Sequence, residues 1–149
     1  MLFRLFTVLM AWWLCPAMLM AQQGLAVAPV FDGRYQSNRN AVEVVVKGRK
    51  LKPYGLTLFK SITLKELPTD AAWITRLVEA DSRNAMDKEE GRIRGRLYYG
   101  FYRFKQDGNV PFRYIFFRNN ALRRGASRDI TVVYMEGNVT IARLKEMFR

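Results

Sequence analysis

The sequence predicts a single α+β domain, with an antiparallel β-sheet of about five strands, one helix packed on a face and a short C-terminal helix. Residues 95–117 concentrate aromatic side chains on two short runs around the turn signal Asp107-Gly108, a pattern typical of a β-hairpin. β-Branched residues dominate 41–46 and 129–135, which predicts two further strands. Apolar residues recur at helical spacing between them, from 68 to 84.

The first residues have the features of a secretory signal peptide. Arg4 is followed by an uncharged apolar run, and 17–21 offers a cleavage site whose exact position stays open. We therefore expect 1–21 to be a signal peptide and 22–149 to be one exported domain, periplasmic or on the outer surface. The alternative is an uncleaved anchor, but Pro16 breaks a run that is already short for a membrane span.

Cys15 is the only cysteine of the chain and lies inside this leader. Lipid attachment requires a small residue before the cysteine, whereas Leu14 precedes it and Pro16 follows it. We expect no lipid anchor and, after cleavage, no disulfide.

The net charge is +12, from 25 Lys and Arg against 13 Asp and Glu. Such a balance attracts anions. For an exported protein the available anionic partners are lipid, lipopolysaccharide or another envelope protein. The alternative is a solvated basic surface that has no partner.

The first half of the mature chain predicts strands at 41–46 and 56–64, joined by a basic turn at 48–52. The segment 24–36 is left open between an extended arm and a short helix that begins at Pro29.

Pro68 marks the boundary of an expected helix that is capped by Thr69 or Asp70 and ends near Arg83 or Asn84. An exposed charged loop is expected to follow at 87–91. For 139–148 we favour a helix capped by Thr140, while a strand after a Gly137-Asn138 turn remains the alternative. A basic stretch precedes the strand at 129–135 and contains Arg123, Arg124 and Arg128.

The residue content limits the chemistry. The chain has no histidine and its mature part has no cysteine, which excludes a Ser-His-Asp triad, a cysteine nucleophile and a histidine-based zinc site. We expect no enzyme activity, metal or cofactor. A hydrolase using two carboxylates is the alternative, although the acidic residues are scattered. The candidate carboxylates are Asp32, Glu43, Glu66, Asp81, Asp87, Glu89 and Glu90.

Basic residues flank the aromatic hairpin, and an open sheet face carrying both would suit phosphates or acidic sugars. The candidate anion-binding residues are Arg92, Arg94, Arg96, Arg103, Lys105 and Arg113. Alternatively, these side chains lay their stems over aromatic rings and keep their charges in water.

Residues 99–104, YGFYRF, partly resemble an aromatic strand of RNA-recognition motifs. The basic residue and glycine that should precede them are Leu97 and Tyr98, and the expected element order differs. We do not expect nucleic acid as a partner.

The leader ending in AQQG, the motif VVVKGRKLKPYGLTLF, the aromatic hairpin and the closing VVYMEGNVTIARLKEMF resemble small exported Bacteroidetes proteins of unknown function. This resemblance implies a Gram-negative envelope and a non-enzymatic role, and it supplies no site residues. The expected function is binding of an anionic envelope component. A structural partner in an envelope assembly is a further alternative, with an unpaired sheet edge or an apolar patch as its mark.

Overall fold

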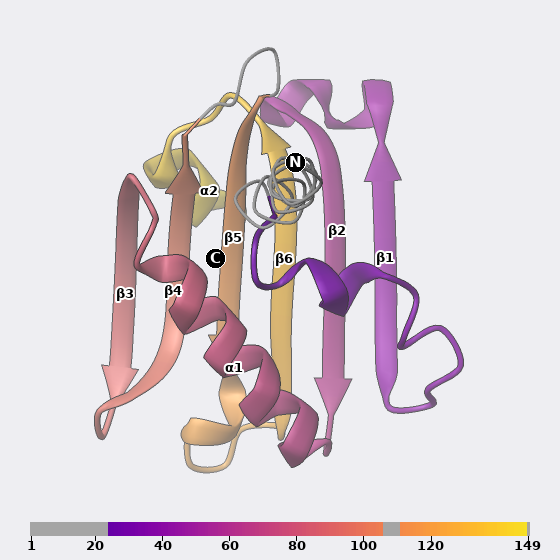
Figure 1. Ribbon diagram of the computed structural model, residues 1–149, viewed down its shortest axis with the longest axis vertical. Coiled ribbons are helices and arrows are strands. Elements are labelled where there is room, and N and C mark those ends of the chain that lie inside the picture. Colours follow the sequence, from indigo (N-terminus) through magenta and orange to yellow (C-terminus); the bar gives the residue numbers. More distant parts are fainter. Residues whose placement is uncertain (1–23, 106–110, 149) are drawn as a thin grey trace, which may run out of the picture.

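The protein forms one antiparallel sheet of six strands in the order β1-β2-β6-β5-β4-β3 (Figure 1). The computed structural model describes residues 24–105 and 111–148. The α+β class is confirmed, but the expected strand count of about five is wrong. The strands are β1 (Ala41–Lys47), β2 (Leu56–Lys65), β3 (Asp87–Ile93), β4 (Arg96–Phe104), β5 (Phe112–Asn119) and β6 (Asp129–Gly137).

The sixth strand is β3, which the sequence suggested was an exposed loop. Its charges are tolerated because β3 lies at the sheet edge and its two glutamates find donors. Glu89 accepts a hydrogen bond from Lys145 at 2.6 Å, and Glu90 accepts one from the hydroxyl of Tyr102 at 2.8 Å. Local composition gave no sign of these partners, which come from elsewhere in the fold.

One face of the sheet, here the α1 face, is covered by helix α1 (Pro68–Ser82) and by the N-terminal arm, residues 24–40 (Figure 1). The expected cap at Thr69 or Asp70 is wrong, because the helix already begins at Pro68, a residue suited to the first turn, and Leu67 at the cap position forms no side-chain cap hydrogen bond. The helix ends at Ser82, close to the expected Arg83 or Asn84. Its buried side chains Ile74 and Val78 pack in the same core as Ile115 and Phe117 of β5. The arm contains the 3₁₀ turn η1 (Ala28–Phe31), so the helical alternative at Pro29 is correct only for a short turn.

The opposite, α2 face is covered in part by helix α2 (Ile141–Met147) and by the 3₁₀ segment η2 (Gly48–Tyr54). The favoured C-terminal helix is confirmed. Thr140 caps it, since its side chain accepts a hydrogen bond from the N–H of Arg143 at 3.2 Å. The short 3₁₀ turn η3 (Asn120–Leu122) follows β5.

The expected aromatic hairpin is confirmed as β4 paired with β5, while its turn at Asp107-Gly108 lies outside the described residues. The side chains alternate between faces, so Tyr102 enters the core of the α1 face and Phe101 that of the α2 face. Gly100 is required here, because a Cβ at this position would overlap the ring and hydroxyl of Tyr102. The hairpin is therefore interior structure on both sides.

Candidate functional site

The structure distributes the six predicted anion-binding residues over both faces and both ends of the sheet. Arg103 and Arg113 lie one register position apart on neighbouring strands and point to opposite faces. Arg94 and Arg96 belong to the β3–β4 turn, and Lys105 follows the other end of β4. The expected single basic and aromatic sheet face is therefore not formed. The sequence pattern could not separate these positions because the register decides the face.

Arg92 and Arg103 each have acidic partners. The Arg92 guanidinium lies 3.1 Å from the carboxylate of Glu79 and 3.8 Å from that of Glu90. Arg103 lies 5.2 Å above the ring of Phe112 and 3.7 Å from Asp87. Arg103 thus lies over an aromatic ring, in line with the alternative in which basic side chains cover the rings of the hairpin, whereas Arg92 contacts carboxylates.

Arg113 lies on the α1 face, where it borders a hollow of about 420 Å³ under the N-terminal arm. Its charge lowers the pKa of Asp81 and that of Tyr134, against the stronger effect of burial, which raises both. The Asp81 carboxylate accepts hydrogen bonds from the backbone N–H groups of Ala26 at 2.7 Å and Val27 at 3.0 Å. This buried acid holds the arm against α1 and is committed to a structural contact.

A concentration of exposed positive charge lies at the end of the sheet where the β3–β4 turn meets the β5–β6 connection (Figure 1). Arg94 donates a hydrogen bond to the carbonyl of Leu122 at 3.4 Å, which links these two segments. Arg123 lies 6.0 Å from the centre of the Tyr98 ring and donates to its hydroxyl at 3.3 Å. We call this surface the basic end. It consists of Arg94, Arg96, Arg123, Arg124 and Arg128, all exposed.

Among the described residues, none of these five guanidinium groups forms an ion pair with a carboxylate. Five exposed positive charges on these two segments create a local positive potential that solvent and salt screen and that Glu66 and Asp129, which border the same hollow as Arg128, reduce. Arg123, Arg124 and Arg128 form a basic stretch in the sequence, but none of them is among the six predicted anion-binding residues. Their separation from Arg94 and Arg96 along the chain concealed the cluster.

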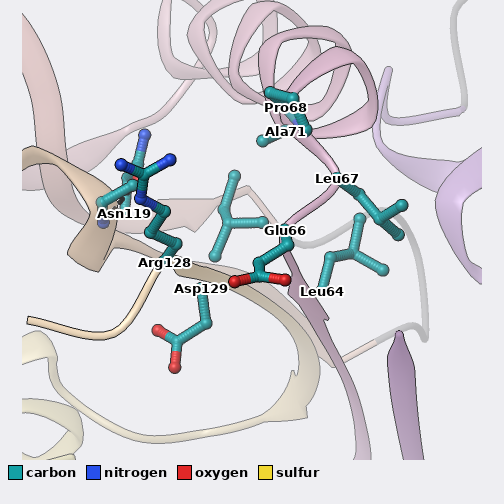
Figure 2. A pocket seen from close by; sticks show the side chains of 10 residues that line it. Leu64, Glu66, Leu67, Pro68, Ala71, Asn119, Arg128 and Asp129 are labelled. Atoms are coloured by element: carbon teal, nitrogen blue, oxygen red, sulfur yellow. Dashed lines mark hydrogen bonds between the residues drawn. The ribbon is translucent and has the colours of Figure 1, made fainter. Parts of the chain in front are cut away.

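A hollow of about 550 Å³ opens beside the basic end, between the start of α1, β2 and the β5–β6 connection (Figure 2). Its wall is largely aliphatic and includes Leu64, Leu67, Ala71 and Ile130. Arg128 supplies a positive charge. In Figure 2 its guanidinium points in a different direction from the carboxylates of Glu66 and Asp129. The hollow therefore joins an apolar lining to one guanidinium, that of Arg128, and two carboxylates, those of Glu66 and Asp129.

Two of the polar side chains that line the hollow, Asp129 and Asn119, accept hydrogen bonds. Asp129 accepts hydrogen bonds from the side chains of Asn120 and Ser127, each at 2.7 Å. Asn119 is 7% exposed, and its side-chain oxygen accepts from the N–H of Ala121 at 3.1 Å. These contacts fix the backbone of the β5–β6 connection and thereby the position of Arg128. They leave Asp129 poorly placed to act as a general acid or base.

A search of the described residues finds no group of three or more side chains that could hold a metal ion. In the same part of the chain, no helix has the length and apolar character needed to cross a membrane.

Comparison with known proteins gives one match. The model of a family of unknown function, DUF6108, matches residues 14–148. No curated protein and no solved structure matches the chain.

Proposed function

Since the chain belongs to the DUF6108 family, whose function is unknown, we propose its function from its surface: it is a non-catalytic protein that binds a phosphate-bearing lipid or lipopolysaccharide of the bacterial envelope. The observation that supports this proposal is the basic end, with its five exposed and unpaired arginines beside an aliphatic hollow. In this proposal the protein is exported and works in the periplasm or on the outer surface.

Arginine suits this role because its planar guanidinium binds phosphate oxygens through two parallel hydrogen bonds. The aliphatic wall of the hollow would receive part of an acyl chain while Arg128 at the rim contacts the headgroup. Apolar burial would then add to an electrostatic attraction that is sensitive to salt. A free acidic sugar would use the arginines but gain little from the aliphatic wall.

The hydrolase alternative has weaker support. Asp129 borders the hollow and accepts hydrogen bonds from two neutral donors. Asp81 lies elsewhere and binds the N-terminal arm. A two-carboxylate mechanism needs two acids free to exchange protons and face one substrate. The arrangement of acids near the basic end does not favour this.

The test is co-sedimentation of the purified protein with vesicles of phosphatidylglycerol and phosphatidylcholine, and with vesicles of phosphatidylcholine alone. We expect binding only to the anionic vesicles, with marked weakening at high salt. Lipopolysaccharide should compete with the vesicles, whereas inorganic phosphate should compete poorly because it lacks an acyl chain.

The decisive variant is Arg94→Gln/Arg96→Gln/Arg128→Gln. Its matched control removes three exposed positive charges at the other end of the sheet, Arg49→Gln/Lys50→Gln/Lys52→Gln. We expect roughly a tenfold loss of affinity for the first and less than about twofold for the control. Equal losses of affinity in the two variants would show a nonspecific effect of net charge. The proposal would be refuted if the wild-type protein did not bind anionic vesicles.

A further inference from the structure

Strand β1 has one unpaired edge. It pairs only with β2, and the hydrogen bond from the N–H of Lys65 to the carbonyl of Asn40, at 2.8 Å, fixes which groups point inward. In an antiparallel ladder the inward groups alternate along the strand. The N–H and C=O groups of Glu43, Val45 and Lys47 therefore point away from β2. The described residues place no backbone partner against these groups.

The side chains of β1 differ from those of an edge strand that is protected against pairing with a further strand. Val42, Val44 and Val45 are 59%, 43% and 49% exposed, and β1 is paired with β2 residue for residue, without a bulge. The other edge strand, β3, presents Asp87, Lys88, Glu89 and Glu90, the kind of charge that deters strand addition. Only one edge of this sheet is thus open to a further strand.

The sequence of β1 is complementary to itself when read in the opposite direction. If Val45 lies opposite Val45 of a second chain, Glu43 lies opposite Lys47, and Val44 lies opposite Val46. Both members of each pair then share one face, since side chains alternate along a strand. Moving the register so that Val44 faces Val44 would oppose Glu43 to a valine and Lys47 to Ala41.

We propose that the protein forms a symmetric dimer in which β1 pairs antiparallel with β1 of a second copy, with Val45 at the two-fold axis. All outward groups of Glu43, Val45 and Lys47 find partners in this arrangement. Two Glu43–Lys47 pairs set the register, and opposite charges directly across strands stabilise pairing. The two sheets become one continuous sheet, and the interface is isologous, as in most homodimers.

A second observation favours a copy of this chain as the occupant. The exposed valines on the α2 face continue into an apolar groove of about 330 Å³, lined by Val46, Tyr54, Phe59, Met147 and Phe148 among others. In the dimer, the two-fold axis brings the same groove of each copy to the joined face. The valines of one β1 then lie beside those of the other, and this contact removes apolar surface of both copies from water.

The test is sedimentation equilibrium of the purified protein from about 1 µM to about 300 µM, a range suited to a weak and specific pair. Wild-type protein should show a monomer–dimer equilibrium. Val45→Pro removes only the outward N–H, so the β1–β2 ladder survives, and this variant should stay monomeric. Circular dichroism and thermal unfolding would establish that the variant is folded.

Charge reversal tests the register. Glu43→Lys alone opposes two lysines, Lys47→Glu alone opposes two glutamates, and each should weaken the dimer about tenfold. The double variant Glu43→Lys/Lys47→Glu restores opposite charges only between copies and should recover the wild-type dissociation constant to within about threefold. Lys88→Glu on the β3 edge is the matched control and should leave it unchanged.

The proposal would be overturned if the wild-type protein stayed monomeric at all the concentrations tested. It would also be overturned if the single charge reversals left the dissociation constant of the dimer unchanged. Failure of the double variant to recover would refute the proposed register, in which Glu43 lies opposite Lys47 of the second copy. None of these outcomes depends on lipid binding, which is measured at the other site.

Discussion

The hydroxyl of Tyr114 accepts a hydrogen bond from the N–H of Val139 and donates one to the carbonyl of the same residue, both at 2.8 Å. Tyr114 is fully buried on β5, and Val139 precedes the cap of α2. Burial raises the pKa of this hydroxyl, so it remains protonated and able to donate. One side chain thus fixes the connection between the sheet and the C-terminal helix.

Tyr114→Phe should destabilise the protein by about 1–3 kcal/mol, because it leaves both backbone groups of Val139 buried without a partner. Urea unfolding followed by circular dichroism would measure the loss. Tyr54→Phe, at a half-exposed position of η2, is the matched control and should change stability by less than about 0.5 kcal/mol. Equal stability of the two variants would refute the role given to Tyr114.

Asp81→Ala should release the N-terminal arm from α1. The carboxylate is 6% exposed and holds the N–H groups of Ala26 and Val27, so its removal should cost about 1–3 kcal/mol. Amide hydrogen exchange should accelerate at Val27 and Val30 well before the sheet exchanges. The exposed Asp87→Ala serves as a control for loss of a carboxylate, and unchanged exchange in the arm of Asp81→Ala would contradict this account.

Stability should fall at alkaline pH partly through Tyr35. Its burial, aided by the hydrogen bond to Asp70 at 2.9 Å, raises its pKa to about 12 from an ordinary value of 10.0. Since the phenol ionises less readily in the folded protein, its contribution is complete below pH 10 and is lost as the pH rises to about 12.

Tyr35→Phe isolates this effect. The variant should be somewhat less stable at neutral pH, because the bond to Asp70 is lost, and its stability should fall less steeply than that of the wild type between pH 10 and 12. Unfolding free energies measured at several pH values give the comparison. Parallel profiles for the two proteins would show that Tyr35 does not titrate differently in the folded state.

Filling the hollow at the basic end should separate its apolar contribution from its charge. Ala121 lines the hollow and is exposed, so Ala121→Trp adds volume there without changing any charge. Affinity for anionic vesicles should fall about fivefold or more, while the salt needed for elution from a cation exchanger should stay the same. Unchanged vesicle binding would mean that the hollow receives no acyl chain.

Much of the fold could be predicted because its signals are local. The β-branched runs predicted β1, β2 and β6, and the aromatic runs predicted β4 and β5. The helical spacing of apolar residues predicted α1. Thr140 marked the start of α2 for the same reason, since a cap acts on its own first turn. β3 could not be found this way, because Glu89 and Glu90 are accommodated by Lys145 and Tyr102, which are distant in sequence or on another strand.

The sequence by itself determined the charge, the absence of histidine and most element types, since these depend on composition and on spacing within single elements. Tertiary structure alone decided where the charges lie. Register sent Arg103 and Arg113 to opposite faces, and topology brought the β3–β4 turn to the β5–β6 connection. A binding surface depends on which segments lie next to each other in space, and the pairing of strands that are distant in sequence determines this.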